Sequence, residues 1–152
     1  MPGNLYDALR ESHEVQRSLL RKLLRSKAGT QDRIGLLTQV RIELEAHEAA
    51  EERFLYVPML MDDSGLLPSR HALHEHHQID ELVEDLRKLD PRNGAWLDKA
   101  RELSHKVHHH LREEEKKFFQ ASGKLLSATL KAKLATGYRR DYARMHKKLS
   151  AA

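Results

Sequence analysis

The fold is decided by two stretches of one design, VRIELEAHEAAEERFL at residues 40–55 and LSHKVHHHLREEEKKF at residues 103–118. When one stretch is laid on the other, their inward positions coincide at steps of four, three, four and four residues, which follow one face of an α-helix. The coinciding pairs are Val40 and Leu103, Leu44 and Val107, His47 and His110, Glu51 and Glu114, and Leu55 and Phe118. Each stretch therefore predicts an amphipathic helix that carries His and Glu, four residues apart, inside an apolar stripe.

The His and Glu of each stripe predict a metal site. Burial of an imidazole or a carboxylate costs free energy unless the group is satisfied, and a metal ion satisfies both kinds of group together. Side chains at positions i and i+4 of a helix lie about 5–6 Å apart at Cβ and can converge on one point. One such pair also arises on solvated helix faces, whereas two pairs in matching apolar frames favour His47, Glu51, His110 and Glu114 as ligands.

The composition of the chain excludes several classes of protein. Its 152 residues are enough for one domain with its own core, and the absence of Cys excludes disulfides, thiolate metal sites and Cys nucleophiles. The first residues show no basic-then-apolar signal segment, and no apolar run approaches the ~20 residues of a membrane span. We therefore expect a cytoplasmic protein without a membrane partner. Neither a Gly-rich phosphate loop nor an Asp-rich magnesium site is present, which argues against a kinase or a nuclease.

Helical periodicity extends over almost the whole chain. It predicts helices over residues 5–26, 31–60, 69–89, 95–121 and 127–149. Gly29 is expected to follow the end of the first helix, Pro58 to kink or stop the second, and Ser69 to cap the third. Four long helices with short connections predict an all-α, up-down-up-down four-helix bundle with an additional C-terminal helix.

A single domain is predicted, with the bundle over residues 1–121 and a basic helix over residues 122–152. Eight Lys and Arg residues and one acidic residue lie between residues 121 and 152. Because no aromatic stacking pattern or known reading motif accompanies this charge, we favour a solvated helix face over a nucleic-acid-binding surface. The apolar stripe of this helix, which includes Leu134 and Tyr138, predicts docking onto the bundle, a second copy of the chain or a protein partner.

The other two bundle helices each carry a His in the middle of their stripe, His13 and His76. A lone core His is usually hydrogen-bonded to a carbonyl or a carboxylate, but here each of four consecutive helices places a His at its apolar centre. The predicted metal ligands are therefore His13, His47, Glu51, His76, His110 and Glu114. His77 is the chief competitor for His76, because it lies at the edge of the same stripe, about 100° around the helix.

Residues close to these stripes have roles that the sequence leaves open. Glu52 or Glu115 could orient a ligand His by accepting a hydrogen bond. Tyr6 and Tyr56 either line the site or belong to the core, and aromatic residues at helical spacing are more often core. The remaining His residues fall off the stripes and are expected at the surface, at an interface or as hydrogen-bond partners of ligands: His71, His74, His105, His108, His109 and His146.

The predicted ligand set suits two metal ions. Four imidazoles and two carboxylates are too many for one structural zinc ion, which usually takes four ligands. They suit two ions bridged by Glu51 and Glu114, each with about two His ligands. Mixed nitrogen and oxygen ligation with open positions is typical of iron, with manganese as the alternative. Ferritin-like bundles use Glu-x-x-His pairs with a different spacing, so the ferritin class is disfavoured.

On these residues the sequence resembles the hemerythrin-like HHE cation-binding domain family, over residues 5–120. The resemblance rests on LRESH at 9–13, HEAAEE at 47–52 with FLYVP at 54–58, EHHQI at 75–79, and HLREEE at 110–115 with FF at 118–119. It implies a four-helix bundle around two non-haem iron ions, bridged by an oxygen atom or by carboxylates, and by position the same six ligands. The sequence departs from the oxygen-carrying hemerythrins at Ala72, where they have His, and at Glu114, which follows His110 by four residues rather than five.

The resemblance also implies chemistry with a small oxidant, so we expect the centre to bind or react with O2, peroxide or NO. Gln16, one turn beyond His13, either donates a hydrogen bond to such a ligand or faces the edge of the core. An iron-sensing or iron-buffering protein that acts through a partner is the alternative. A scaffold without metal would leave the two matching His–Glu pairs inside apolar stripes unexplained. Whether the chain is an enzyme, such as a di-iron oxidoreductase for peroxide or NO, stays open.

Overall fold

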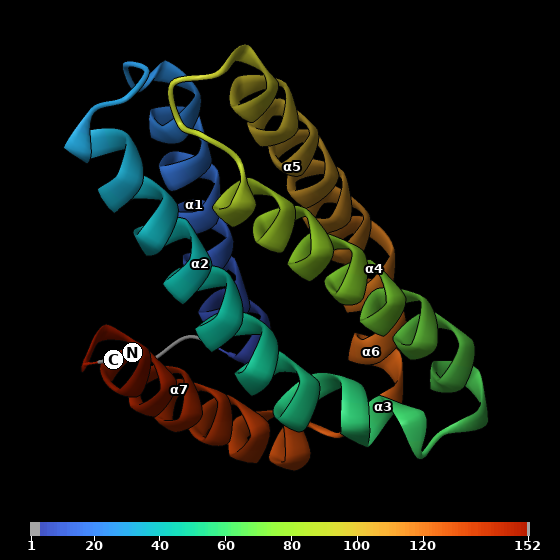
Figure 1. Cartoon of the computed structure of the whole chain (residues 1–152). Helices are drawn as coiled ribbons and strands as arrows, with labels where there is room; N and C mark the ends of the chain where they lie inside the picture. Colours follow the sequence, from blue (N-terminus) through green and yellow to red (C-terminus); the bar gives the residue numbers. More distant parts are fainter. Residues whose placement is uncertain (1–3, 152) are drawn as a thin grey trace.

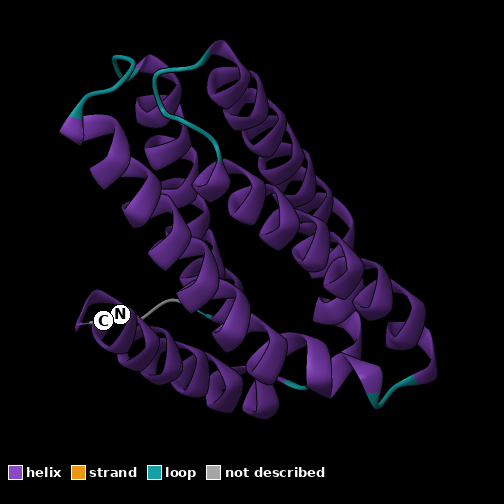
Figure 2. Ribbon diagram, viewed as in Figure 1, coloured by secondary structure: helices purple, strands orange, loops and turns teal. Residues whose placement is uncertain are grey.

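The computed structural model describes residues 4–151 and shows an almost entirely helical chain, without a β-strand among these residues (Figure 2). Four long helices form the bundle: α1 (Leu5–Arg25), α2 (Gln31–Glu51), α4 (Asp63–Lys88) and α5 (Gly94–Glu113). The turns between α1 and α2 and between α4 and α5 lie at one end, and α3 (Val57–Leu60) lies at the other (Figure 1). The predicted up-down-up-down bundle is therefore confirmed.

Polar caps set the starts of the bundle helices. Asn4 caps α1: its side chain accepts a hydrogen bond from the backbone N–H of Asp7, and the Asp7 carboxylate accepts one from the backbone N–H of Asn4. Thr30 and Asn93 likewise accept hydrogen bonds from backbone N–H groups at the starts of α2 and α5. These bonds satisfy donors that have no partner within the helix. Gly29, in the first turn, has a φ of 73°, which glycine adopts at little cost.

The third bundle helix begins earlier than the sequence predicts. We expected its cap at Ser69, but Asp62 caps α4 by accepting a hydrogen bond of 2.8 Å from the backbone N–H of Ser64. Pro68, which precedes the expected helix, lies inside α4 as its sixth residue, just beyond the first turn in which a proline is best tolerated. Gly65 permits the early start, because a Cβ at this position would lie 2.2 Å from the carbonyl oxygen of Met59.

Two of the bundle helices continue through short π-helical segments. The chain passes from α2 through η1 (Glu52–Tyr56) into α3, and from α5 through η2 (Glu114–Phe118) into α6 (Phe119–Leu125). A π-helical turn joins residues five apart rather than four, so it rotates the residues that follow it about the helix axis. The two segments lie next to the matched residues Glu51 and Glu114, and the regular sequence period did not predict them.

The core consists of two apolar clusters at different levels of the bundle. The cluster nearer the α1–α2 and α4–α5 turns includes Leu20, Leu44, Val83, Trp96 and Leu103. The cluster nearer α3 includes Leu9, Leu55, Tyr56, Phe118 and Tyr138. Along each bundle helix the predicted metal ligands lie near the level at which the residues of one cluster give way to those of the other. The polar centre is therefore sealed by apolar side chains above and below.

The C-terminal helix α7 (Ala128–Ala151) packs along α2 and against α1 (Figure 1). Leu134 and Tyr138 on its buried face belong to the apolar cluster nearer α3. A Cβ at Gly137 would lie 2.3 Å from the ring carbon Cε1 of Phe54, so close packing of α7 explains a glycine in the helix interior. Among residues 4–151, no helix is long and apolar enough to cross a membrane.

Candidate metal centre

Six side chains from the four bundle helices converge between the two apolar clusters. They are the predicted ligands His13 of α1, His47 and Glu51 of α2, His76 of α4, His110 of α5 and Glu114 of η2. All six are buried, with at most 4% of their surface exposed. They form a His13/His47 cluster and a His76/His110 cluster, each of which also contains Glu51 and Glu114. Within either cluster the candidate ligand atoms lie within 4.8 Å of one another.

The alternative candidate His77 lies away from these clusters. Its side chain is 69% exposed, and its Nε2 atom lies 2.7 Å from a carboxylate oxygen of Glu81, one helical turn further on. The structure therefore brings His76, and not His77, to the centre. The pair of His77 and Glu81 has the same i, i+4 spacing as the pairs in the centre, but it lies on a solvated helix face.

Each central carboxylate contacts one imidazole from each cluster. The Nε2–oxygen distances at Glu51 are 3.3 Å for His47 and 3.2 Å for His76, and those at Glu114 are 3.2 Å for His13 and 3.5 Å for His110. Both carboxylates thus lie between the two pairs of imidazoles.

Several buried polar atoms of the centre have no hydrogen-bond partner within residues 4–151. Those on the inner side are Nε2 of His13, His47 and His110, Oε2 of Glu51 and Oε1 of Glu114, and on the outer side Nδ1 of His76 is unpaired as well. Almost all buried polar groups in proteins are paired, because an unpaired one costs free energy. Cations between these atoms would satisfy the imidazole nitrogens and carboxylate oxygens together. The donor set therefore fits metal ions, and its division into two clusters with two shared carboxylates fits a pair of them.

The other ring nitrogen of each imidazole faces a further oxygen atom. The Nδ1–oxygen distances are 2.7 Å from His13 to Glu115, 2.7 Å from His47 to Tyr138, 3.5 Å from His76 to Glu52 and 2.9 Å from His110 to Glu75. An ionised carboxylate can only accept, so Nδ1–H is the donor in the contacts with Glu115 and Glu75. Such a bond fixes the ring orientation and leaves the Nε2 lone pair free to bind a metal.

Sequence reasoning found two of these four oxygen partners. We expected Glu52 or Glu115 to accept a hydrogen bond from a ligand His: Glu115 accepts one from His13, and Glu52 lies 3.5 Å from Nδ1 of His76. Tyr138 carried a signal, because its side chain has a polar hydroxyl group within the apolar stripe of the last helix. We assigned this residue to packing alone. Glu75 also carried a signal, because it lies four residues before Ile79 at the edge of the apolar stripe of its helix, but we assigned it no role.

The two central carboxyl groups ionise unequally in the metal-free chain. Burial raises the pKa of Glu114, and the neighbouring carboxylate of Glu51 raises it further. Burial also disfavours the ionised form of Glu51. The charges and hydrogen bonds around Glu51 nevertheless hold its pKa well below its usual range, and the charge of His47 has the largest effect among them. Two carboxylates in contact repel each other. A cation between them would favour ionisation of both.

Neighbouring carboxylates favour the protonated form of two of the imidazoles. Burial opposes a charge on His13, but its close contact with the Glu114 carboxylate and its hydrogen bond with Glu115 outweigh this effect and raise the pKa of His13 to about 9. The pKa of His76 is raised well above its usual value, against the effect of burial, by nearby carboxylates of which Glu48 contributes most. Since a metal binds the neutral imidazole, cations entering the centre displace these protons.

Tyr56 of η1 places a phenol oxygen in the centre, which the sequence left open between a pocket and a core position. Its hydroxyl donates a hydrogen bond of 2.8 Å to Oε1 of Glu51, contacts Oε2 of Glu114 and lies 3.4 Å from Nε2 of His76. Tyr6, named together with it, donates or accepts a hydrogen bond with Ser122 instead. Tyr56 is therefore a site residue whose position depends on the π-helical turn.

The other polar residues named from the sequence lie around the centre. Gln16 is buried and its amide donates to Ser12, which in turn donates to Glu43, so the expected bond from Gln16 to an exogenous ligand stays a prediction. Most of the remaining His residues contact nearby oxygen atoms: His71 contacts Glu75 and Glu113, His108 the Ser104 carbonyl, His109 Glu113, and His146 Glu43. His74 and His105 lie in helices α4 and α5 without a role at the centre in these contacts.

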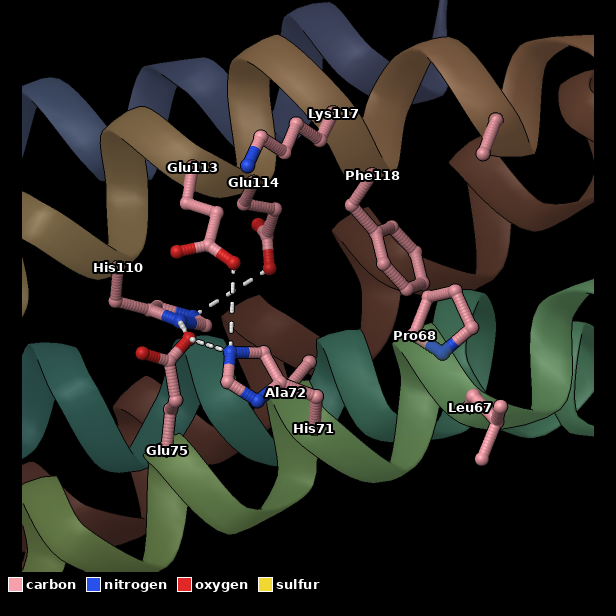
Figure 3. A pocket seen from close by; sticks show the side chains of 11 residues that line it. Leu67, Pro68, His71, Ala72, Glu75, His110, Glu113, Glu114, Lys117 and Phe118 are labelled. Atoms are coloured by element: carbon pink, nitrogen blue, oxygen red, sulfur yellow. Dashed lines mark hydrogen bonds and ion pairs between the residues drawn. The ribbon is translucent and has the colours of Figure 1, made fainter.

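A cavity of about 430 Å³ reaches the centre from the side of α4 and α5. His110 and Glu114 line it, and Figure 3 shows His110 pointing toward Glu75, and Glu113 toward His71, on the facing helix. Its wall is apolar, formed by Leu67, Pro68, Ala72, Phe118 and Ala121, while His71, Glu75, Glu113 and Lys117 supply its polar edge. Ala72, where a longer side chain would intrude, leaves this space open.

A four-helix bundle with two buried His/Glu clusters defines a class of cation-binding helical protein. The family model described as hemerythrin HHE cation binding domain matches residues 4–122. The chain therefore belongs to this family, as the resemblance in its sequence implied. Its domain binds metal cations through His/Glu clusters of the kind found here.

Two relatives illustrate how far the similarity extends. A protein named DNA nickase from Nostoc sp. (strain PCC 7120 / SAG 25.82 / UTEX 2576) is 26% identical over 148 residues, which cover 96% of this chain and 41% of the nickase. The crystal structure of a hemerythrin HHE cation binding domain-containing protein from Mycobacterium kansasii matches with a TM-score of 0.85 and 22% identity. That match covers 96% of this chain and 89% of the other, and it shows a shared fold, α7 included.

Proposed function

We propose that this protein holds a non-haem di-iron centre that binds or reacts with a small oxidant, namely O2, peroxide or NO. The contact of each central carboxylate with one imidazole from each cluster carries the proposal, because it suits two bridged ions rather than one. In this proposal His13 and His47 hold one ion, His76 and His110 hold the other, and both Glu residues bridge.

The chemistry of the donors supports iron. Imidazole and carboxylate ligands suit iron, and manganese is the alternative that the same donors accept. When bound, ferrous ions supply open coordination positions and the electrons that a small oxidant accepts.

The protein's own residues prepare the centre for this task. Glu75 and Glu115 orient His110 and His13 through their Nδ1–H groups. The apolar clusters above and below keep bulk water away from the ligands. The cavity beside Ala72 gives a small molecule a way to His110 and Glu114. These features support a site that is enclosed and still reachable.

Iron loading tests the proposed centre. Wild-type protein and the Glu51→Ala/Glu114→Ala variant are loaded anaerobically with Fe(II), desalted and assayed for iron per chain. We expect about two irons per wild-type chain and loss of most of this iron in the variant, since both ions share the two carboxylates. The matched control is His77→Ala/Glu81→Ala, which removes a His–Glu pair of the same spacing from the surface and should retain the iron.

The oxidant is tested on the loaded protein. The diferrous form is mixed with O2, H2O2 and NO in separate experiments, and the absorption spectrum and product are followed. A spectral change with at least one of the three supports the proposal. A centre that holds iron and responds to none of them would contradict the oxidant chemistry while leaving iron binding in place.

An iron-sensing role is the second candidate, favoured by one contact. Tyr138 of α7 lies 2.7 Å from Nδ1 of His47, so the metal state of the centre and the position of α7 are physically linked. The exposed basic residues of α7 offer a surface to an acidic protein partner. A change in oligomeric state or partner binding between apo and iron-loaded protein, without turnover, would favour this role over oxidant reduction.

The name of the Nostoc relative adds a control. The chain spans 41% of that DNA nickase, and nicking is attributed to a protein more than twice as long. We expect iron-loaded protein to leave supercoiled plasmid intact in an assay with peroxide scavengers present, in line with the expected lack of a nucleic-acid partner.

A further inference from the structure

A third cluster of metal-binding groups lies at the rim of the cavity beside Ala72. It consists of His71 and Glu75 of α4 and of Glu113, the last residue of α5. One donor atom of each residue lies within 4.8 Å of the donor atoms of the other two. Figure 3 shows His71 joined to both carboxylates, which come from facing helices. None of the three residues belongs to the six ligands of the centre.

The contacts of His71 have the lengths of coordination edges. Its Nε2 atom lies 3.5 Å from Oε1 of Glu75 and 3.4 Å from Oε1 of Glu113, whereas most N–H···O hydrogen bonds measure about 2.9–3.0 Å. Two ligand atoms that bind one ion at about 2.1 Å, with a tetrahedral angle between them, are about 3.4 Å apart. The Nε2–oxygen contacts of the central Glu residues span the same range, from 3.2 to 3.5 Å. An ion therefore fits between these atoms without a large movement.

Exposure and charge suit this cluster to the capture of a cation from solvent. The side chain of His71 is 58% exposed, that of Glu113 is 30% exposed and that of Glu75 only 4%. A hydrated ion can therefore meet His71 and Glu113 at the surface and exchange water for the buried carboxylate. The cavity lining carries three carboxylates, those of Glu75, Glu113 and Glu114, and one ammonium group, that of Lys117. This excess of carboxylates attracts cations.

The second oxygen of each carboxylate is held by a side chain of α5. Oε2 of Glu75 lies 3.5 Å from Nζ of Lys106, and Oε2 of Glu113 lies 3.1 Å from Nε2 of His109. Both carboxylates therefore present Oε1 to His71 while another group contacts Oε2. Partners of this kind orient a ligand toward its metal. The direction of the two Oε1 atoms toward His71 is thus set by the fold.

Glu75 connects the cluster to the metal centre. Its Oε1 atom, which faces His71, also accepts a hydrogen bond of 2.9 Å from Nδ1 of His110. His110 and Glu114 line the same cavity as the cluster. An ion held at the rim would therefore lie on the way that leads into the His76/His110 cluster.

We propose that His71, Glu75 and Glu113 form a third cation site, the rim site, which takes up a divalent transition-metal ion such as Fe(II) from solvent and passes it to the centre. An imidazole and two carboxylates suit such an ion, and water completes its coordination on the exposed side. Three protein ligands and an open side let the ion leave again, as a loading site requires. The loading role rests on the proposed two-ion centre, whereas binding at the rim does not.

Equilibrium dialysis against Co(II) without oxygen counts the bound ions. Wild type is compared with His71→Ala, which removes an exposed imidazole, and with Glu113→Gln, which removes a charge and keeps the size of the side chain. The matched control is His77→Ala, because His77 lies on the same helix and contacts a carboxylate four residues further on. We expect about three Co(II) per chain in wild type and control, and about one fewer in both rim variants. Equal counts in all four proteins would overturn the site.

The rate of iron uptake tests the loading role. Each protein is mixed anaerobically with Fe(II), sampled at intervals into a chelator that removes loosely bound iron, desalted and assayed for iron per chain. His71→Ala and Glu113→Gln should fill the centre several-fold more slowly than wild type and reach the same final iron content, because neither residue is a ligand of the centre. His77→Ala should fill at the wild-type rate. Wild-type rates in both rim variants would overturn the loading role.

The outcomes also separate this inference from the proposed function. A wild-type chain that retains about two irons after desalting but binds no third Co(II) would refute the rim site and leave the di-iron proposal standing. If the wild-type chain retains fewer irons, and His71→Ala still binds about one Co(II) fewer than wild type, the di-iron proposal is refuted. The rim site then stands as a cation site, and its loading role is refuted together with the centre.

Discussion

The hydroxyl of Tyr138 lies 2.7 Å from Nδ1 of His47. Tyr138 belongs to α7, whereas the Nδ1 partners of His13 and His110 are carboxylates of the bundle itself, and the carboxylate near Nδ1 of His76 is that of Glu52, 3.5 Å away. The C-terminal helix therefore contributes to the surroundings of the metal centre as well as to the core. Removal of α7 would expose this imidazole and the apolar face of α2 together.

We expect Tyr138→Phe to weaken metal binding about 10- to 100-fold, because loss of a hydrogen-bond partner to a ligand His has effects of this size. The phenyl ring preserves the packing of a residue that is 2% exposed. Competition with a chelator under anaerobic conditions measures the affinity. Tyr142→Phe is the control, since its hydroxyl bonds to Glu43 rather than to a ligand. Equal affinities for the three proteins would contradict the prediction.

The start of α4 gives a stability prediction with a matched control. A Cβ at Gly65 would lie 2.2 Å from the backbone carbonyl of Met59, which cannot move without shifting the chain. Gly65→Ala should therefore cost about 1–3 kcal/mol in free energy of unfolding. Gly35→Ala, in open space on α2, should instead stabilise by about 0.5–1 kcal/mol. Urea denaturation of the metal-free proteins measures both, and a neutral Gly65→Ala would show that α4 can begin elsewhere.

Much of the fold and the site could be predicted because both depend on helical period. The steps from Val40 to Glu51 and from Leu103 to Glu114 placed ligands on inward faces, and the structure brings the six of them together. Burial of His13 and His76 in mid-stripe followed from the same period.

Features that depend on departures from this period could not be predicted. Tyr56 falls about 140° from Glu51 on a regular helix, so only the π-helical segment brings it to the centre. The early start of α4 depends on close contact of Gly65 with Met59, which is a tertiary feature. The position of Glu75 beside His110 likewise depends on how α4 and α5 face each other.

Metal affinity should rise with pH. The pKa of His13 in the metal-free chain is about 9 and that of His76 is also raised, so both imidazoles carry protons at neutral pH that a metal must displace. Between the ordinary His value of 6.5 and about 9, the apparent affinity should increase about tenfold per pH unit for each proton displaced. Calorimetry with Co(II) in buffers of different ionisation enthalpy counts the protons. Binding without proton release would contradict the raised pKa values.

The cavity beside Ala72 should control access to the centre. Ala72→Leu places a larger side chain against the space that His110 and Glu114 line. We expect the diferrous protein to react several-fold more slowly with H2O2, and to lose more of its rate with bulkier tert-butyl hydroperoxide. Iron per chain should stay unchanged, because Ala72 supplies no donor atom. Stopped-flow absorption measures the rates.

Leu67→Ala tests the same route in the opposite direction, because Leu67 is an exposed residue of the cavity wall. It should leave the H2O2 rate nearly unchanged and raise the rate with the bulkier peroxide, since the wider cavity relieves a steric limit on the larger molecule alone.

Ala143→Leu, on the exposed face of α7, is the control for the leucine that Ala72→Leu adds. If both peroxides react at wild-type rates in Ala72→Leu, the oxidant reaches the ligands by local opening of the bundle rather than through this cavity.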